Sequence, residues 1–281
     1  MADARSQDIV QPSHETASDT REVSFIDEIP KQSELSHLKL APFQFKERVK
    51  CPQCQRSSLM YCSNCLKPLP SVPIPHLTLP IPLHIVHHPK EKKSKSTAMH
   101  ALILAPESTT IHEFPNFPDF NPKETLCLFP AEDAKLLEDF DVSPFKQVVF
   151  IDSTWSQAKQ ICRDARIQSL TKVRIHDQKT LFWRTQTEAP EFLATIEAIY
   201  YFFKEYFEAS HKQPYNGEFD NLMFFYAFNY EHIQDLFAKS KDRLVSRKIS
   251  DSYLRERREH HPDPSQPKSR DRDHSPDGHD D

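Results

Sequence analysis

Four cysteines stand close together near the amino-terminal end of the chain, in a spacing that suits a metal ion. They form two Cys-x-x-Cys pairs separated by seven residues: Cys51, Cys54, Cys62 and Cys65. Two such knuckles can wrap four thiolates tetrahedrally around one Zn²⁺. Paired disulfides conflict with the lack of a secretion signal, and a redox motif would be single and follow a strand. We therefore expect a closed, structural zinc site.

A second group of chemically capable residues follows the clearest apolar run, residues 148–151. The next four residues are Asp152, Ser153, Thr154 and Trp155. Asp152 would then lie at the carboxyl end of a buried strand, where open α/β sheets place their ligands. Ser153 or Thr154 can cap a helix, and its expected buried face carries Trp155, Ala158, Ile161, Cys162 and Ala165. Two interpretations stay open from these residues alone: a functional Asp152, or a helix cap beside a packed tryptophan.

The elements that must position these residues read as an α/β class. Short apolar runs without alternation, typical of buried parallel strands, occur at residues 83–86, 101–104, 126–129 and 148–151. Residues 131–140 carry apolar side chains at helical spacing, and the proline-rich residues 106–122 predict an extended loop. Two longer helices are expected near the end, at about residues 190–209, beginning with a proline, and 220–239. Strands separated by helices favour a mostly parallel sheet with flanking helices.

Composition excludes several classes of protein. The 281 residues include only two glycines, so no glycine-rich phosphate loop can be present. No run of 18 apolar residues occurs, and the first residues lack the pattern of a signal peptide, so we expect no membrane association. The net charge of −5 is nearly neutral evidence on RNA binding, because binding needs only a local basic face.

The chain divides into four expected regions. Residues 1–40 predict a disordered leader, 45–70 a cysteine module, 71–240 the α/β domain, and 241–281 a disordered tail of mixed charge. The basic pieces of that tail favour either RNA contact or nuclear import, and a merely solvated tail is the alternative. The expected location is the nucleus, with the cytoplasm as a second compartment.

Several motifs in sequence resemble one family. Asp152, Thr154 and Trp155 resemble the Asp-x-Thr-Trp signature that names the DTW-domain family. Residues 128–134 are similar to its Phe-Pro-x-Glu-x-Ala segment, and residues 193–198 to its Thr-x-Glu-Ala segment. The cysteine knuckles and residues 87–97 are similar too. The resemblance covers about residues 45–235, with the motifs in the family's order.

The resemblance implies a SPOUT-like α/β fold, in which the chain can be knotted, and a transferase that uses S-adenosylmethionine. Its members attach the 3-amino-3-carboxypropyl group to N3 of a tRNA uridine, here in the D-loop at position 20, and release methylthioadenosine. It implies catalytic residues Asp152, Thr154 and Trp155, and cofactor-binding residues Phe129, Pro130, Glu132, Arg184, Thr195 and Glu197. One departure is the lack of a glycine in residues 96–100.

Each of these residues has a role that its chemistry suggests. Asp152 is a candidate general base for the N3 proton, and Trp155 offers an aromatic face to a sulfonium or a base. Arg184 suits a carboxylate or a phosphate. Glu197 would hold the cofactor's ammonium or orient Arg184, with a simple ion pair as the alternative. Candidates for phosphate contact are His87, His88 and Lys95.

Two other functions are compatible with the residues. An RNA methyltransferase of similar fold differs in its products and not in local chemistry. A zinc-stabilised RNA-binding adaptor would bind no S-adenosylmethionine.

Overall fold

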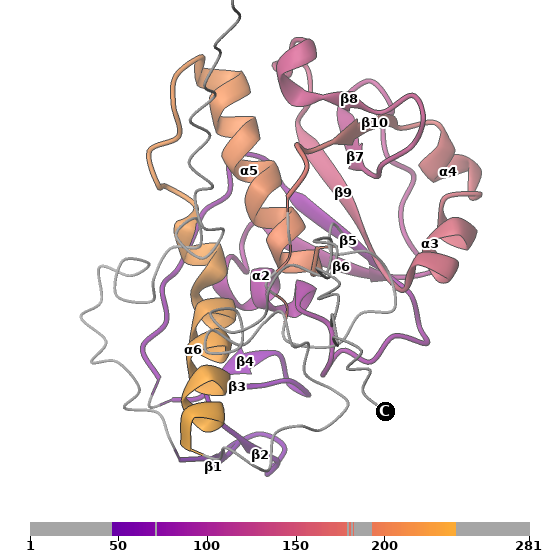
Figure 1. The fold of residues 1–281 in the computed structure, drawn as a ribbon. Helices are drawn as coiled ribbons and strands as arrows, with labels where there is room; N and C mark the ends of the chain where they lie inside the picture. The colour runs from indigo at the N-terminus through magenta and orange to yellow at the C-terminus, as the bar shows by residue number, and fades with distance from the viewer. Residues whose placement is uncertain (1–46, 71, 179, 181, 183–192, 240–281) are drawn as a thin grey trace, which may run out of the picture.

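A six-stranded parallel sheet forms the centre of the molecule (Figure 1). The computed structural model describes residues 47–70, 72–178, 180, 182 and 193–239. The strand order is β6-β5-β9-β7-β10-β8, and every pairing in this sheet is parallel. The strands are β5 (Leu83–His87), β6 (Thr109–Glu113), β7 (Thr125–Leu128), β8 (Lys135–Leu136), β9 (Gln147–Asp152) and β10 (Thr171–Arg174).

The sheet is covered by helices on both faces, because its interior strands are apolar on both sides. Ile85 and Phe150 point into a core shared with α2 (Ala98–Leu104) and α5 (Thr195–His211). Val86 and Val149 point the other way, into a smaller core with α3 (Trp155–Ile161) and α4 (Ala165–Gln168). Figure 1 shows α3 and α4 on the opposite side of the sheet from α5. The α/β class with a parallel sheet and flanking helices is confirmed.

The four cysteines lie in two small antiparallel ribbons at one end of the molecule. Their strands are β1 (Val49–Lys50) with β2 (Ser57–Ser58), and β3 (Tyr61–Cys62) with β4 (Lys67–Pro68). Met60 and Leu69 share a core with Ile103 of α2 and with Phe225 and Phe228 of α6 (Phe224–Lys239). The cysteine ribbons are therefore packed directly against the helical layer.

Two sequence predictions of elements were wrong. Residues 101–104 form part of α2 and not a strand, because a short run that is apolar on all sides is ambiguous between the two. Residues 131–140 form β8 and the 3₁₀ turn Leu137–Asp139 in place of an α-helix. The expected loop at residues 106–122 contains the edge strand β6. The runs at 83–86, 126–129 and 148–151 are confirmed as β5, β7 and β9.

The two late helices are confirmed with shifted starts. α5 begins at Thr195, whereas the proline expected at its start, Pro190, lies outside the described residues. The second begins with a 3₁₀ turn, Asp220–Met223, and continues as α6. The expected leader and tail also lie outside the described part of the chain. Within that part, no helix is both long enough and apolar enough to span a bilayer.

Candidate active site

A pocket opens at the carboxyl ends of β7, β9 and β10, where a parallel sheet of this kind binds ligands. Its volume is about 310 Å³, within the range of small-molecule sites. Segments from five elements meet there, and the lining residues that matter below are Phe129, Pro130, Ser153, Trp155, Arg174 and Thr195. The lining mixes aromatic and polar groups, which suits a ligand with both apolar and charged parts.

Trp155 lies at the mouth of this pocket and not in the core. Its side chain belongs to a residue that is 36% exposed, so the prediction that it packs on the buried face of its helix was wrong. Its ring centroid is 6.2 Å from that of Phe129, with the planes inclined at 45°. The reason is the helix boundary: Trp155 is the first residue of α3, which ends at Ile161, so Ala165 belongs to the next helix and is exposed. Two aromatic faces therefore border the pocket.

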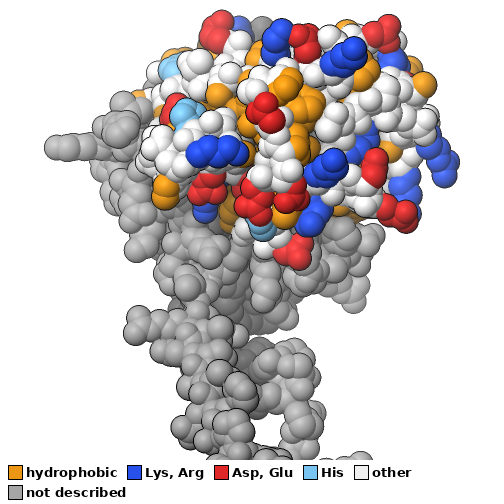
Figure 2. Space-filling model, turned by 90° about the horizontal axis from the view of Figure 1, so that it is seen from above, with side chains coloured by type: hydrophobic (Ala, Val, Ile, Leu, Met, Phe, Trp, Pro, Cys, Tyr) orange, Lys and Arg blue, Asp and Glu red, His pale blue; other side chains and the backbone are white. Residues whose placement is uncertain are grey.

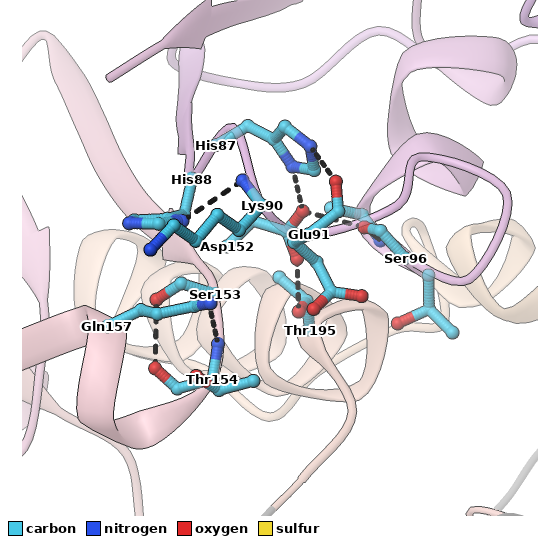
Figure 3. A network of polar contacts seen from close by, with 12 residues as sticks. His87, His88, Lys90, Glu91, Ser96, Asp152, Ser153, Thr154, Gln157 and Thr195 are labelled. Carbon is cyan, nitrogen blue, oxygen red and sulfur yellow. Dashed lines mark hydrogen bonds and ion pairs between the residues drawn. The ribbon is translucent and has the colours of Figure 1, made fainter. Parts of the chain in front are cut away.

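Asp152 lies just behind the pocket, at the last position of β9, and is 3% exposed. Its carboxylate accepts hydrogen bonds from His87 Nδ1 at 2.6 Å, Ser96 Oγ at 2.7 Å and Thr195 Oγ1 at 2.9 Å (Figure 3). It does not cap α3, so the interpretation of Asp152 as a helix cap is wrong. The carboxylate is instead the meeting point of three segments that are far apart in sequence.

His87 is held as an imidazolium. It is the last residue of β5 and pairs with Asp152 across the sheet register. Nδ1 faces the Asp152 carboxylate and Nε2 faces the Glu91 carbonyl oxygen at 3.0 Å, so both ring nitrogens must donate. Burial lowers the pKa of His87, but the hydrogen bond and the charge of Asp152 outweigh burial and raise it above its usual value. The site therefore contains a buried ion pair.

The partners of Asp152 also fix the starts of two helices. Ser96 Oγ accepts the backbone N–H of Ala98 at 3.1 Å, at the first turn of α2. The hydroxyl of the neighbouring Thr97 accepts the N–H of Ile196, at the start of α5, at 3.2 Å. Because Thr195 lines the pocket, the carboxylate of Asp152 fixes the position of a pocket hydroxyl.

Glu197 is fully buried and lies behind the pocket wall. One carboxylate oxygen accepts Thr180 Oγ1 at 2.6 Å and the Ala194 N–H at 2.7 Å; the other accepts Tyr226 Oη at 2.7 Å. These bonds join the segment after β10 to α5 and α6. Arg184, the partner that the sequence suggested, lies outside the described residues.

The remaining predicted residues occupy the rim or lie beyond it. Phe129 and Pro130 line the pocket, whereas Glu132 is exposed and is not part of the lining. Thr154 is the N-cap of α3, and its N–H accordingly donates to Gln157 Oε1 at 3.0 Å. His88 is buried and its Nδ1 accepts the Lys90 N–H, so neither it nor His87 is placed for phosphate contact.

Sequence reasoning missed the contribution of β10. Arg174, His176, Asp177 and Gln178 follow from this strand into the pocket lining. His176 lies between Glu138 and Glu205, each at 3.3 Å. The signal was the pattern of β10, in which Val173 is buried between two polar neighbours, but a strand of four residues is weak evidence.

The four cysteine sulfurs lie within 4.8 Å of one another. The Cys51–Cys65 and Cys54–Cys62 sulfur separations are 3.9 and 3.4 Å, so these pairs are not disulfides. A tetrahedral ion with Zn–S bonds of about 2.3 Å needs sulfur separations of about 3.8 Å. Gln55 and Leu66, each directly after a knuckle, adopt left-handed φ angles of 60° and 53° that turn the chain back. The cluster fits one tetrahedral metal ion.

Fold and site together define an α/β protein with a ligand pocket at the carboxyl edge of a parallel sheet and a four-cysteine cluster beside it. The DTW domain model matches residues 48–234, which include the cysteines, the sheet and the pocket. The chain belongs to the DTW-domain family.

Several curated relatives share one name. A mouse protein named tRNA-uridine aminocarboxypropyltransferase 1 is 37% identical over 249 residues, covering 70% of this chain and 82% of its own. Proteins of the same name from Xenopus laevis and human are 36% and 33% identical, covering 72% and 67% of this chain and 85% and 78% of theirs. No solved structure matches the chain.

Proposed function

We propose that this protein is a tRNA-uridine aminocarboxypropyltransferase. It would transfer the 3-amino-3-carboxypropyl group of S-adenosylmethionine to N3 of a D-loop uridine, at position 20, with release of methylthioadenosine. The observation that carries the proposal is the family match, because residues 48–234 contain the whole pocket and the Asp152 network. The names of the relatives supply the reaction.

In this reaction the bond from uridine N3 to the terminal methylene of the aminocarboxypropyl group forms. The bond from that carbon to sulfur breaks, and the sulfur keeps the electron pair. The main task of the protein is orientation, because the methyl group and two methylene carbons on the same sulfur compete for the nucleophile. Phe129 and Trp155 border the pocket with aromatic faces, which attract a sulfonium through their π systems. Arg174 is a pocket cation suited to the carboxylate of the transferred group.

Asp152 is better suited to positioning than to taking the N3 proton. Its carboxylate is buried, already accepts three hydrogen bonds and is not part of the pocket lining. Its contact with the pocket is through the Thr195 hydroxyl, which it orients. The N3 proton would then leave to water, and Asp152 and His87 would keep the pocket wall in place.

The cysteine cluster would hold a structural zinc ion. All four ligands come from the protein, so the site would be closed, and its chemistry would be to fix the ribbons on α2 and α6. The parallel sheet with its pocket at the carboxyl edge supports a SPOUT-like fold. Nuclear localisation and residues 1–40 and 241–281 as disordered ends stay predictions from the sequence.

The identity of the small-molecule product tests the proposal against the two other functions. The purified protein is incubated with unmodified tRNA transcript and S-adenosylmethionine, and the nucleoside products are separated by chromatography. Methylthioadenosine is expected, in an amount that increases with the amount of tRNA added. S-adenosylhomocysteine would identify a methyltransferase, and a protein that binds no S-adenosylmethionine would be the adaptor.

A further inference from the structure

A second hollow of about 310 Å³ lies between the cysteine ribbons and α6, apart from the candidate active site. Its floor is aromatic, with Tyr61, Phe225 and Phe228, and the last two are almost completely buried. Its rim is polar and includes Arg48, Arg56, Ser94 and His232. A buried aromatic floor under a basic, hydroxyl-rich rim suits an elongated anion that lies across it.

One loop connects this hollow to the active site. Ser94 lines the hollow, and Ser96, two residues further on, donates to the Asp152 carboxylate at 2.7 Å. The loop between β5 and α2 also carries Lys90, Lys92 and Lys93, all of them exposed. A ligand that occupies the hollow and follows this loop arrives beside the Asp152 network.

The charge around the hollow is opposite to that of the chain. Residues 47–67 and 88–97 contain eight lysines and arginines and two glutamates, whereas the whole chain has a net charge of −5. The balance stays positive even when four thiolates around a divalent ion are counted. The face that Figure 2 shows, seen from the end of the molecule away from the cysteine ribbons, mixes both signs. Arg48 and Arg56 on the rim and the exposed lysines of the loop therefore form the basic part of this region.

We propose that the hollow and the loop of residues 88–97 bind the phosphate backbone of the substrate tRNA. This inference rests on the proposed function, because it names how that substrate is held. Backbone phosphates are the partner that clustered lysines and arginines recognise without base contacts. Arg48 is already bound to Ser57, by its guanidinium to the hydroxyl at 3.4 Å and to the carbonyl at 2.7 Å, so Arg56 and the loop lysines are the main contacts.

The test measures the affinity of the full chain for a labelled tRNA transcript at several salt concentrations. Arg56→Ala, Lys92→Ala and Lys93→Ala are each expected to weaken tRNA binding about threefold to tenfold and to reduce the salt slope by about one. Lys123→Ala is the matched control, since Lys123 is exposed just before β7, at the amino end of the parallel strands, whereas the loop of residues 88–97 follows the carboxyl end of β5. The control should bind tRNA as the parent does.

S-adenosylmethionine affinity and thermal unfolding should be unchanged in all four variants. The inference would be overturned if the variants of the hollow and the loop bound tRNA as tightly as the parent does. It would also be overturned if Lys123→Ala lost as much tRNA affinity as they do. A loss of S-adenosylmethionine affinity would also overturn it, because the loop would then act through the pocket. If tRNA binding responds as expected but no methylthioadenosine forms, the tRNA-binding role of the hollow and the loop is supported and the proposed reaction is wrong.

Discussion

The buried ion pair between His87 and Asp152 makes a prediction that separates it from an ordinary hydrogen bond. His87→Gln keeps one donor toward Asp152 but removes the positive charge. The two side chains are 2% and 4% exposed and their atoms are 2.6 Å apart, so solvent screens the pair little. Removing one partner of such a pair costs about 3–5 kcal/mol. Because the glutamine amide can still donate to Asp152, we expect a loss of stability at the lower end of this range, about 3 kcal/mol.

That loss corresponds to a fall in Tm of about 6–12 °C for a domain of this size. The sign of the pH dependence follows from the raised pKa of His87. A raised pKa contributes stability that is complete below the unfolded value of about 6.5 and is lost as the pH rises through the folded value. The difference in the free energy of unfolding between the parent and His87→Gln should therefore be largest near pH 6 and should decrease as the pH rises. Calorimetry or circular dichroism at several pH values measures it.

His84→Gln is the control, because His84 is on the same strand but has neutral partners. It contacts His112 and Gln147, each at 3.1 Å, and burial lowers the pKa of its ring. His84 should contribute about 1 kcal/mol to the free energy of unfolding, and this contribution should be lost as the pH falls. The imidazolium assignment is wrong if His87→Gln costs no more than His84→Gln, or if the difference between the parent and His87→Gln does not decrease with rising pH.

Three further predictions concern the pocket wall and the cysteine cluster. Trp155→Ala should weaken S-adenosylmethionine binding about tenfold by calorimetry, yet change stability by less than about 1 kcal/mol, because Trp155 is 36% exposed; a stability loss without an affinity loss would contradict this. Tyr226→Phe removes the hydroxyl that donates to an oxygen of the buried Glu197 at 2.7 Å. The free energy of unfolding in denaturant should fall by about 1.5–3 kcal/mol. An unchanged free energy of unfolding would show that this hydrogen bond does not stabilise the pocket wall. Cys62→Ser should reduce bound zinc from one ion per chain toward none by elemental analysis and lower Tm; full occupancy in this variant would refute the four-ligand site.

The parts of this protein that the sequence predicts are those with local signals. The cysteine spacing alone brings four sulfurs together, and the unalternating run at 148–151 places Asp152 at the end of an interior strand. His87 was not predicted as its partner, because they are 65 residues apart and meet only through the register of β5 on β9. No local pattern encodes that register.

Other misses have the same physical origin. The pocket side of β10 was missed because this strand lies between β7 and β8, an order that the chain sequence does not reveal. Trp155 was expected to be buried because it stands at helical spacing with Ala158 and Ile161, which are buried. As the first residue of α3, it lines the pocket instead.

The modified nucleoside tests most directly whether this protein transfers an aminocarboxypropyl group to a tRNA uridine. Unmodified tRNA transcript is incubated with the protein and S-adenosylmethionine, digested, and analysed by mass spectrometry. One uridine, at position 20 of the D-loop, is expected to gain the mass of the 3-amino-3-carboxypropyl group. A methyl mass on any nucleoside, or unchanged tRNA with S-adenosylmethionine bound to the protein, would contradict it.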